Sequence, residues 1–213
     1  MSSTAATFDP RCRRCPRLAD FREETARLYP GYHAAPVAPF GDAQPSWLIV
    51  GLAPGMHGAN RTGRPFTGDH AGLILYQTLH AVGAASAPVS IALDDGLSLQ
   101  GVRITNAVKC LPPQNKPTPA ETRSCNAFLR AELAQHQCVK VILALGRIAH
   151  DAVLDALGEQ RSRHPFAHAA EHQLAAGRYL IDSYHCSRYN TQTRRLTAQM
   201  FLEVMQRARE LAQ

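Results

Sequence analysis

Long apolar runs are absent from this 213-residue sequence, since no stretch approaches the roughly 20 apolar residues that a membrane-spanning helix needs. The opening residues, MSSTAATFDP, also lack the basic and then apolar regions of a secretory signal peptide. These absences exclude an integral membrane protein of the helical kind and argue against secretion. We therefore expect a cytoplasmic chain with no membrane partner.

Lysine is scarce as well, because only three of the 23 basic residues are lysine and the others are arginine. The formal net charge at pH 7 is +6. Arginine suits planar, bidentate contacts with phosphate groups, but a G+C-rich genome produces the same bias. Charge alone therefore leaves open whether the chain binds nucleic acid, another polyanion or neither.

The chain is 45% hydrophobic and long enough to bury a full core, so we interpret residues 1–213 as one domain. Four short and nearly continuous apolar runs are typical of buried parallel strands: 47–50, 102–108, 139–145 and 179–183. Helical patterns lie between or after them, at 71–82, 119–136, 148–157 and 196–211. This alternation predicts a three-layer α/β/α fold around a central, mainly parallel sheet of four strands.

Residues 51–69, GLAPGMHGANRTGRPFTGD, follow the first predicted strand and contain few apolar side chains. A loop so rich in glycine can bring backbone N–H groups close to an anion. It also carries Phe66 and Asp69, one ring and one carboxylate that can point inward. This combination predicts a reaction site.

Two more polar segments, 106–116 and 184–195, follow other predicted strands. Ligands of such folds bind beyond the carboxyl ends of the strands, so we expect all three segments to converge on one rim. Each segment taken singly is also compatible with an ordinary connection between a strand and a helix.

Six cysteines in a chain expected to be cytoplasmic favour metal ligands or buried thiols over a disulfide framework. Cys12 and Cys15 form a close pair, whereas Cys110 and Cys125 flank a proline-rich turn. Four thiolates from two distant segments can hold a tetrahedral zinc ion or a [4Fe–4S] cluster, and either would tie the two segments together. Four unrelated buried thiols are the alternative interpretation.

The motifs and the cysteine spacing together resemble family 5 (type B) uracil-DNA glycosylases of the iron–sulfur kind. The motifs are GLAPGMHGANRTGRPFTGD (51–69), TNAVKCLPPQNKPTPAE (105–121) and YHCSRYNTQTRRLT (184–197). The resemblance extends in the same order over about residues 12–209, which chance matches of short motifs do not do. Leu52 occupies the place of an acidic residue in the related family 4, and this departure favours family 5.

The resemblance implies a DNA repair enzyme that turns a damaged base out of double-stranded DNA and hydrolyses its N-glycosidic bond, leaving an abasic site. Its substrates would be uracil and other deaminated bases such as hypoxanthine. We expect a monomer that works at the nucleoid if the source is a prokaryote. The implied cofactor is a [4Fe–4S] cluster, in preference to zinc, on Cys12, Cys15, Cys110 and Cys125.

The resemblance also implies roles for individual residues. Asp69 matches the carboxylate proposed to activate water in this family, and His185 matches the histidine of the late motif. His185 and backbone N–H groups can stabilise charge on the leaving base. Phe66 matches the ring that stacks on the extruded base, and Asn106 the amide that reads its edge. The substrate-binding set also includes Gly51, Ala53 and Gly55. The DNA-binding set is Arg61, Arg188, Asn190, Arg194 and Arg195.

Each of these residues has a structural interpretation too. Asp69 precedes a predicted helix and can be its N-cap. Phe66 can belong to the core, Asn106 can end a strand, and His185 can be a hydrogen-bonded structural histidine. The polar residues of segment 184–195 can form a solvated surface.

Two other protein classes stay open at this point. One is a non-catalytic DNA-binding protein that uses an iron–sulfur cluster as a redox sensor and needs neither Asp69 nor His185. The other is a nucleotide-binding enzyme in which residues 51–58 cradle a phosphate. No Lys-Ser/Thr pair follows these glycines and no GxGxxG motif is present, which weakens the second alternative.

Overall fold

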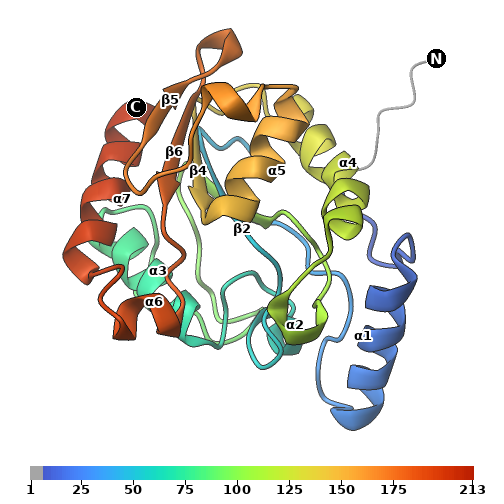
Figure 1. Cartoon of the computed structure of the whole chain (residues 1–213). Coiled ribbons are helices and arrows are strands. Elements are labelled where there is room, and N and C mark those ends of the chain that lie inside the picture. Colours follow the sequence, from blue (N-terminus) through green and yellow to red (C-terminus); the bar gives the residue numbers. More distant parts are fainter. Residues whose placement is uncertain (1–6) are drawn as a thin grey trace.

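A computed structural model describes residues 7–213 of the chain (Figure 1). Its centre is a six-stranded sheet with the strand order β1-β3-β2-β4-β6-β5. The inner strands are mutually parallel: β3 (Val102–Asn106), β2 (Trp47–Gly51), β4 (Val141–Leu145) and β6 (Tyr179–Ser183). The outer strands pair antiparallel at the two edges: β1 (Phe40–Gly41) and β5 (Glu171–Gln173).

The predicted fold class is confirmed, but the sheet has six strands where the sequence predicted four. The four predicted strands are the inner ones. The edge strands were missed because two or three paired residues are too short to show a hydrophobic period. The predicted strand 102–108 ends earlier, at Asn106, and the predicted strand 139–145 begins later, at Val141.

Helices cover both faces of the sheet. On one face lie α3 (His70–Ala81) and α7 (Ala198–Ala212), and on the other lie α4 (Pro119–Gln135) and α5 (Arg147–Leu157). Shorter elements lie in the connections: α2 (Ala59–Thr62), η1 (Pro113–Asn115), η2 (Arg161–Arg163), η3 (Ala175–Gly177) and α6 (Arg188–Gln192). None of the helices in residues 7–213 is both long and apolar enough to cross a membrane.

The core follows from the alternation of side chains along the strands. Trp47 and Ile49 of β2 face the cluster formed with α3 and α7, whereas Leu48 and Val50 face the cluster formed with α4 and α5. All four side chains are buried. A parallel strand that is buried on both faces therefore reads as a continuous apolar run, which is why the sequence located it.

The sequence analysis did not predict the helix α1 (Pro16–Leu28), which begins with proline at its first position but is rich in charged side chains. Its residue Leu18 packs with Phe128 of α4 in a third, smaller cluster. The helix lies beside α4 at the margin of the molecule (Figure 1). The interpretation as one domain covered residues 1–213, of which residues 1–6 lie outside the described residues.

Candidate functional site

A cavity of about 430 Å³ opens at the carboxyl ends of the parallel strands. All three polar segments singled out in the sequence contribute to it, as expected for this fold. Its lining residues are Leu52, Ala53, Gly55, Ala59, Phe66, Asp69, His70, Ala71, Asn106, Asn115, His185, Ser187 and Arg188.

The floor of the cavity depends on Gly51, the last residue of β2. Gly51 is paired with Asn106 of β3, so the two strands end side by side. A Cβ atom on Gly51 would lie 2.5 Å from Oδ1 of Asn106 and 2.6 Å from the ring of Phe66. Only glycine leaves room for this amide and this ring together.

Asn106 is 2% exposed, and its Oδ1 atom is buried without a hydrogen-bond partner. An unpaired buried acceptor costs about 1–3 kcal/mol, and native structures rarely keep one without a reason. Because Asn106 also lines the cavity, its amide is available to a polar ligand. Such an amide can both donate and accept.

Phe66 is held in an unusual backbone conformation, with φ of +54°. A side chain on Gly72, in the first turn of α3, would collide with the Phe66 carbonyl, so the close approach requires glycine at 72. The Phe66 ring is nearly parallel to that of His185, with an interplanar angle of 28° and centroids 5.9 Å apart. Non-glycine residues with positive φ cluster at functional sites, and this one places an aromatic face in the cavity wall.

Asp69 is the N-cap of α3, because its Oδ1 accepts a hydrogen bond of 2.9 Å from the Gly72 backbone N–H. Its second oxygen, Oδ2, lies against two glycines of the loop. A Cβ on Gly58 would overlap Oδ2, and one on Gly55 would lie 3.1 Å from it. The carboxylate thus has one oxygen engaged in the cap, while the residue also lines the cavity. The two interpretations of Asp69 are compatible.

His185 follows β6 and is half-buried. Burial lowers the pKa of its imidazole below the ordinary value of 6.5, and the negative charge of Asp69 opposes part of this shift. Asn190 supports the loop, since its Nδ2 donates to the His185 carbonyl at 2.8 Å. At pH 7 His185 is therefore a neutral imidazole that can donate one N–H into the cavity.

We expect Asp69→Asn to lower the pKa of His185 further, because the carboxylate charge that opposes the desolvation is removed. The measurement is the titration of His185 by NMR, with a midpoint below 6.5 in the parent and lower still in the variant. His168 is the internal control, since burial also lowers its pKa but the opposing charge is Glu203. An upward shift of the His185 midpoint in Asp69→Asn would contradict this account of the electrostatics.

The predicted DNA-binding residues are engaged differently, and of the five only Arg188 lines the cavity. Arg188 is exposed at the cavity, and Arg194 is exposed with a φ of +55°. The guanidinium of Arg195 lies over the Tyr184 ring, 4.5 Å from its centroid. Arg61, on α2, lines a different hollow of the surface together with Tyr29 and Tyr32, and its Nε donates to the His57 carbonyl at 2.8 Å.

One charged residue of the 51–69 loop is structural. Arg64 is 2% exposed and lies 2.6 Å from Asp95, and it also donates to Ser90 and to the Leu93 carbonyl. Burial alone would raise the pKa of Asp95, but the hydrogen bonds from Arg64 and from backbone N–H groups lower it well below its usual range. Arg64 therefore holds residues 90–95 in place through this ion pair and these hydrogen bonds, and it does not line the cavity.

Sequence reasoning missed three rim residues. His70 lines the cavity and contacts Thr191 of α6 through Nε2 at 2.9 Å, so it links two walls. Asn115 lines it from the proline-rich turn, with a φ of +56°. Tyr189, on α6, is 71% exposed beside Arg188. Only adjacency to Asp69 and to the other motif residues could have pointed to them, because none has a distinctive spacing.

The four spaced cysteines lie together although they come from distant segments. Cys12, Cys15, Cys110 and Cys125 line one small cavity of about 20 Å³ between α1 and α4. None of the four forms a disulfide, and no three of their sulfur atoms lie within 4.8 Å of one another. Burial raises the pKa of Cys110 to about 12 and also raises that of Cys125. The third core cluster is thus built around four sulfurs.

A comparison with protein families decides the relationship of the chain. The family model described as the uracil DNA glycosylase superfamily matches residues 38–209. The chain belongs to this superfamily. The matched range includes all six strands of the sheet and every residue that lines the cavity, whereas Cys12 and Cys15 precede it.

Individual relatives place the chain more closely. A type-5 uracil-DNA glycosylase of Thermus thermophilus is 52% identical over 206 residues, which are 94% of each chain. The type-5 enzyme of Mycobacterium leprae is 45% identical over 94% of this chain and 91% of its own length. That of Pyrobaculum aerophilum is 42% identical over 92% and 87%. The family 5 resemblance drawn from the motifs is confirmed.

Proposed function

We propose that this protein removes uracil from DNA by hydrolysing the N-glycosidic bond, leaving an abasic site. The observation that carries the proposal is the cavity in which the unpaired amide of Asn106, the Phe66 ring and the groups of Asp69 and His185 meet. The type-5 relatives support it.

Base recognition follows from the floor of the cavity. A base turned out of the duplex can stack on Phe66, while the Asn106 amide pairs with its lactam edge. Uracil offers adjacent N–H and C=O groups, which an amide can satisfy at once. Hypoxanthine presents the same lactam, so we include it and other deaminated bases in the proposed substrate range. Gly51 leaves the room that this arrangement needs.

Bond cleavage leaves positive charge on the sugar and negative charge on the leaving base. The Asp69 carboxylate can orient or deprotonate the attacking water and is attracted to the developing charge on the sugar. His185, neutral at pH 7 because burial lowers its pKa, can donate its N–H to the uracil anion.

The DNA itself is held by the basic rim. Arg188, Arg194 and Arg195 are exposed beside the cavity, and guanidinium groups in this position can contact phosphates on either side of the extruded nucleotide. We propose double-stranded DNA as the substrate, a monomer as the working form and the cytoplasm, at the chromosome, as the place of action.

The four cysteines fit a [4Fe–4S] cluster better than zinc. Thiolates on one tetrahedral zinc ion lie about 3.8 Å apart, because each Zn–S bond is about 2.3 Å. The sulfur atoms of this protein are more widely spaced, since no three of them lie within 4.8 Å of one another. A four-iron cubane accepts wider spacing because each cysteine binds a different iron. We propose that such a cluster, when bound, cross-links residues 12–15 to residues 110–125 and has a structural function.

The experiment that tests the function is incubation with a duplex carrying one uracil, followed by alkaline cleavage of the abasic strand. Cleavage at the uracil supports the proposal, and parallel duplexes with hypoxanthine define the substrate range. Tight binding without cleavage would favour a cluster-based redox sensor. Binding of a free nucleotide with neither DNA binding nor cleavage would favour a phosphate-binding enzyme.

A single methyl group should test the floor of the cavity. We expect Gly51→Ala to lose cleavage by about a hundredfold, because the new Cβ displaces the Asn106 amide or the Phe66 ring, and small misplacements in an active site have effects of this size. Single-turnover cleavage of the uracil duplex is the measurement. Gly31→Ala is the matched control, since a Cβ there meets nothing within 4 Å. Equal rates for the two variants would show that Gly51 does not shape the base site.

A further inference from the structure

A group of three rings beside the cavity carries two arginines. We call Phe166, His168 and Tyr184 the aromatic wall. The His168 ring is stacked on Tyr184 with centroids 5.1 Å apart, and Phe166 is tilted against Tyr184 at 6.2 Å. All three residues are half-buried, and Tyr184 immediately precedes His185. The wall therefore adjoins the site where the base is cleaved.

Both arginines are exposed and lie over rings of the aromatic wall. The guanidinium carbon of Arg147 is 5.5 Å from the Phe166 centroid, and that of Arg195 is 4.5 Å from the Tyr184 centroid. Arg147 is the first residue of α5 and follows Gly146, where a Cβ would lie 3.6 Å from Cβ of His185. A ring under a guanidinium restricts its position and leaves its N–H groups free for an anion.

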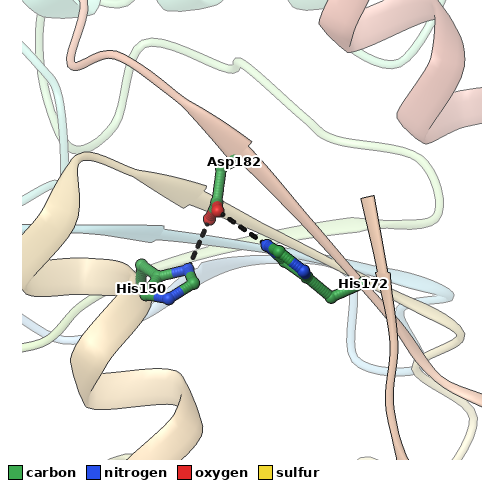
Figure 2. A group of neighbouring side chains, drawn as sticks. All are labelled: His150, His172 and Asp182. Atoms are coloured by element: carbon green, nitrogen blue, oxygen red, sulfur yellow. Dashed lines mark hydrogen bonds and ion pairs between the residues drawn. The ribbon is translucent and has the colours of Figure 1, made fainter. Parts of the chain in front are cut away.

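The aromatic wall is fastened by a buried network, shown in Figure 2. His150 Nδ1 lies 2.7 Å from Oδ1 of Asp182, and His172 Nε2 lies 3.1 Å from Oδ2 of the same carboxylate. His150 and Asp182 are both completely buried. The other nitrogen of His150, Nε2, contacts the His164 carbonyl at 2.9 Å, which fixes the start of the segment that carries Phe166.

Hydrogen-bond chemistry makes this network rigid. The His164 carbonyl is an acceptor only, so Nε2 of His150 donates to it and the orientation of the ring is fixed. Both oxygens of Asp182 are engaged by imidazole nitrogens, one from His150 and one from His172. Removing any of these side chains would leave a buried polar group without a hydrogen-bond partner, so the network holds both segments in place.

A bound metal ion is the alternative explanation for this cluster, because the ligand atoms of His150, His172 and Asp182 lie within 4.8 Å of one another. Two ligands on one tetrahedral zinc ion would lie about 3.3 Å apart, because each bond is about 2.0–2.1 Å. The observed 2.7 Å between Nδ1 and Oδ1 is instead the length of a hydrogen bond. The geometry favours a proton over a metal.

We propose that Arg147 and Arg195, each stacked on a ring of the aromatic wall, bind phosphates of the DNA backbone on one side of the cavity. The buried network of His150, Asp182 and His172 positions this wall. The proposal rests on the proposed function, because it assumes that the ligand of the cavity is part of a DNA duplex. It adds Arg147 to the residues that bind DNA and gives the rings and the network a positioning role.

The salt dependence of binding to an undamaged duplex tests the contact. We expect Arg147→Ala and Arg195→Ala each to lower the slope of log K against log salt by about 0.9, the value for one phosphate contact. Arg209→Ala removes the same charge at the far end of α7, near Gly83, and should leave the slope unchanged. An unchanged slope in Arg147→Ala would overturn the assignment of Arg147.

The positioning role is tested with an uncharged side chain. Phe166→Leu keeps the apolar packing but removes the aromatic face, so we expect it to lower the salt slope as Arg147→Ala does, although it removes no charge. The double variant should show no further change. A parental slope in Phe166→Leu together with a lowered slope in Arg147→Ala would show that the ring does not position the guanidinium.

Three measurements complete the test. NMR of the ring nitrogens should show hydrogen on Nε2 of His150, which faces the His164 carbonyl, whereas an Nε2 without hydrogen would overturn the network. Stoichiometric zinc in the parent that is lost in His172→Ala would overturn it as well. The same preparation is assayed for uracil cleavage. If the parent cleaves the uracil duplex but Arg147→Ala leaves the salt slope of binding unchanged, only this inference is refuted. If the parent binds DNA but does not cleave at uracil, the proposed function is refuted.

Discussion

Asp69→Asn is expected to retain binding of the uracil duplex and to lose its single-turnover cleavage by on the order of a hundredfold. Asparagine is as good an N-cap as aspartate, so the hydrogen bond to the Gly72 N–H can persist and α3 should stay in place. What the variant lacks is the negative charge near the sugar and a base for water. The rate and the melting temperature of the same samples are the measurements.

A cap variant elsewhere separates stability from catalysis. Thr197 is the N-cap of α7 and accepts from the Met200 N–H at 3.1 Å. Thr197→Ala should cost about 1 kcal/mol of stability and leave cleavage unchanged. If Asp69→Asn cleaves at the parental rate, Asp69 is only a cap. His185 or a water molecule held by the backbone would then be the next candidate for activating the attack.

Cys110→Ser is expected to abolish the iron content and the cooperative unfolding of the protein together. The parent should be brown and contain about four irons per chain. Cys110 is buried in the core cluster that joins α1 to α4. Without bound iron and sulfide, this joint would depend on the packing of Leu18 and Phe128 and on the ion pair between Arg17 and Glu121. Metal analysis, the visible spectrum and thermal unfolding followed by circular dichroism provide the readout.

Cys138→Ser provides the matched substitution, because Cys138 is an exposed thiol whose Sγ contacts only the Pro45 carbonyl among the described hydrogen-bond partners. It should retain iron, colour and melting behaviour. Stoichiometric zinc in protein prepared with iron available would refute the cluster. Full iron content in Cys110→Ser would exclude Cys110 as a ligand.

Much of the fold was predictable because its signals are local. The inner strands are buried on both faces and therefore appear as apolar runs, and α7 shows its apolar face in the spacing of Phe201, Val204 and Met205. The edge strands are too short for such a signal, and the many charged side chains of α1 obscure its apolar face. They exist because of partners: β1 pairs with β3, and α1 is held by contacts around the cysteines.

Part of the candidate site was predictable as well. The order of parallel strands and helices places the ends of β2, β3 and β6 on one edge, so the loops that follow them had to meet there. Residue types in those loops, such as Phe66, Asp69 and His185, then suggested chemistry. His70 and Asn115 carry no pattern of their own, and only the folded chain shows that they line the cavity.

The sequence by itself determined the fold class, the meeting of three loops at one rim and the family, because hydrophobic periods and motif order are properties of the chain. The tertiary structure alone decided how each polar group is used. Arg64 became a buried partner of Asp95, and the Asn106 oxygen stayed unpaired in the cavity. His150, which no motif marked, became the centre of a buried hydrogen-bond network. Burial and hydrogen-bond partners depend on which distant segments meet, and a one-dimensional pattern does not contain that information.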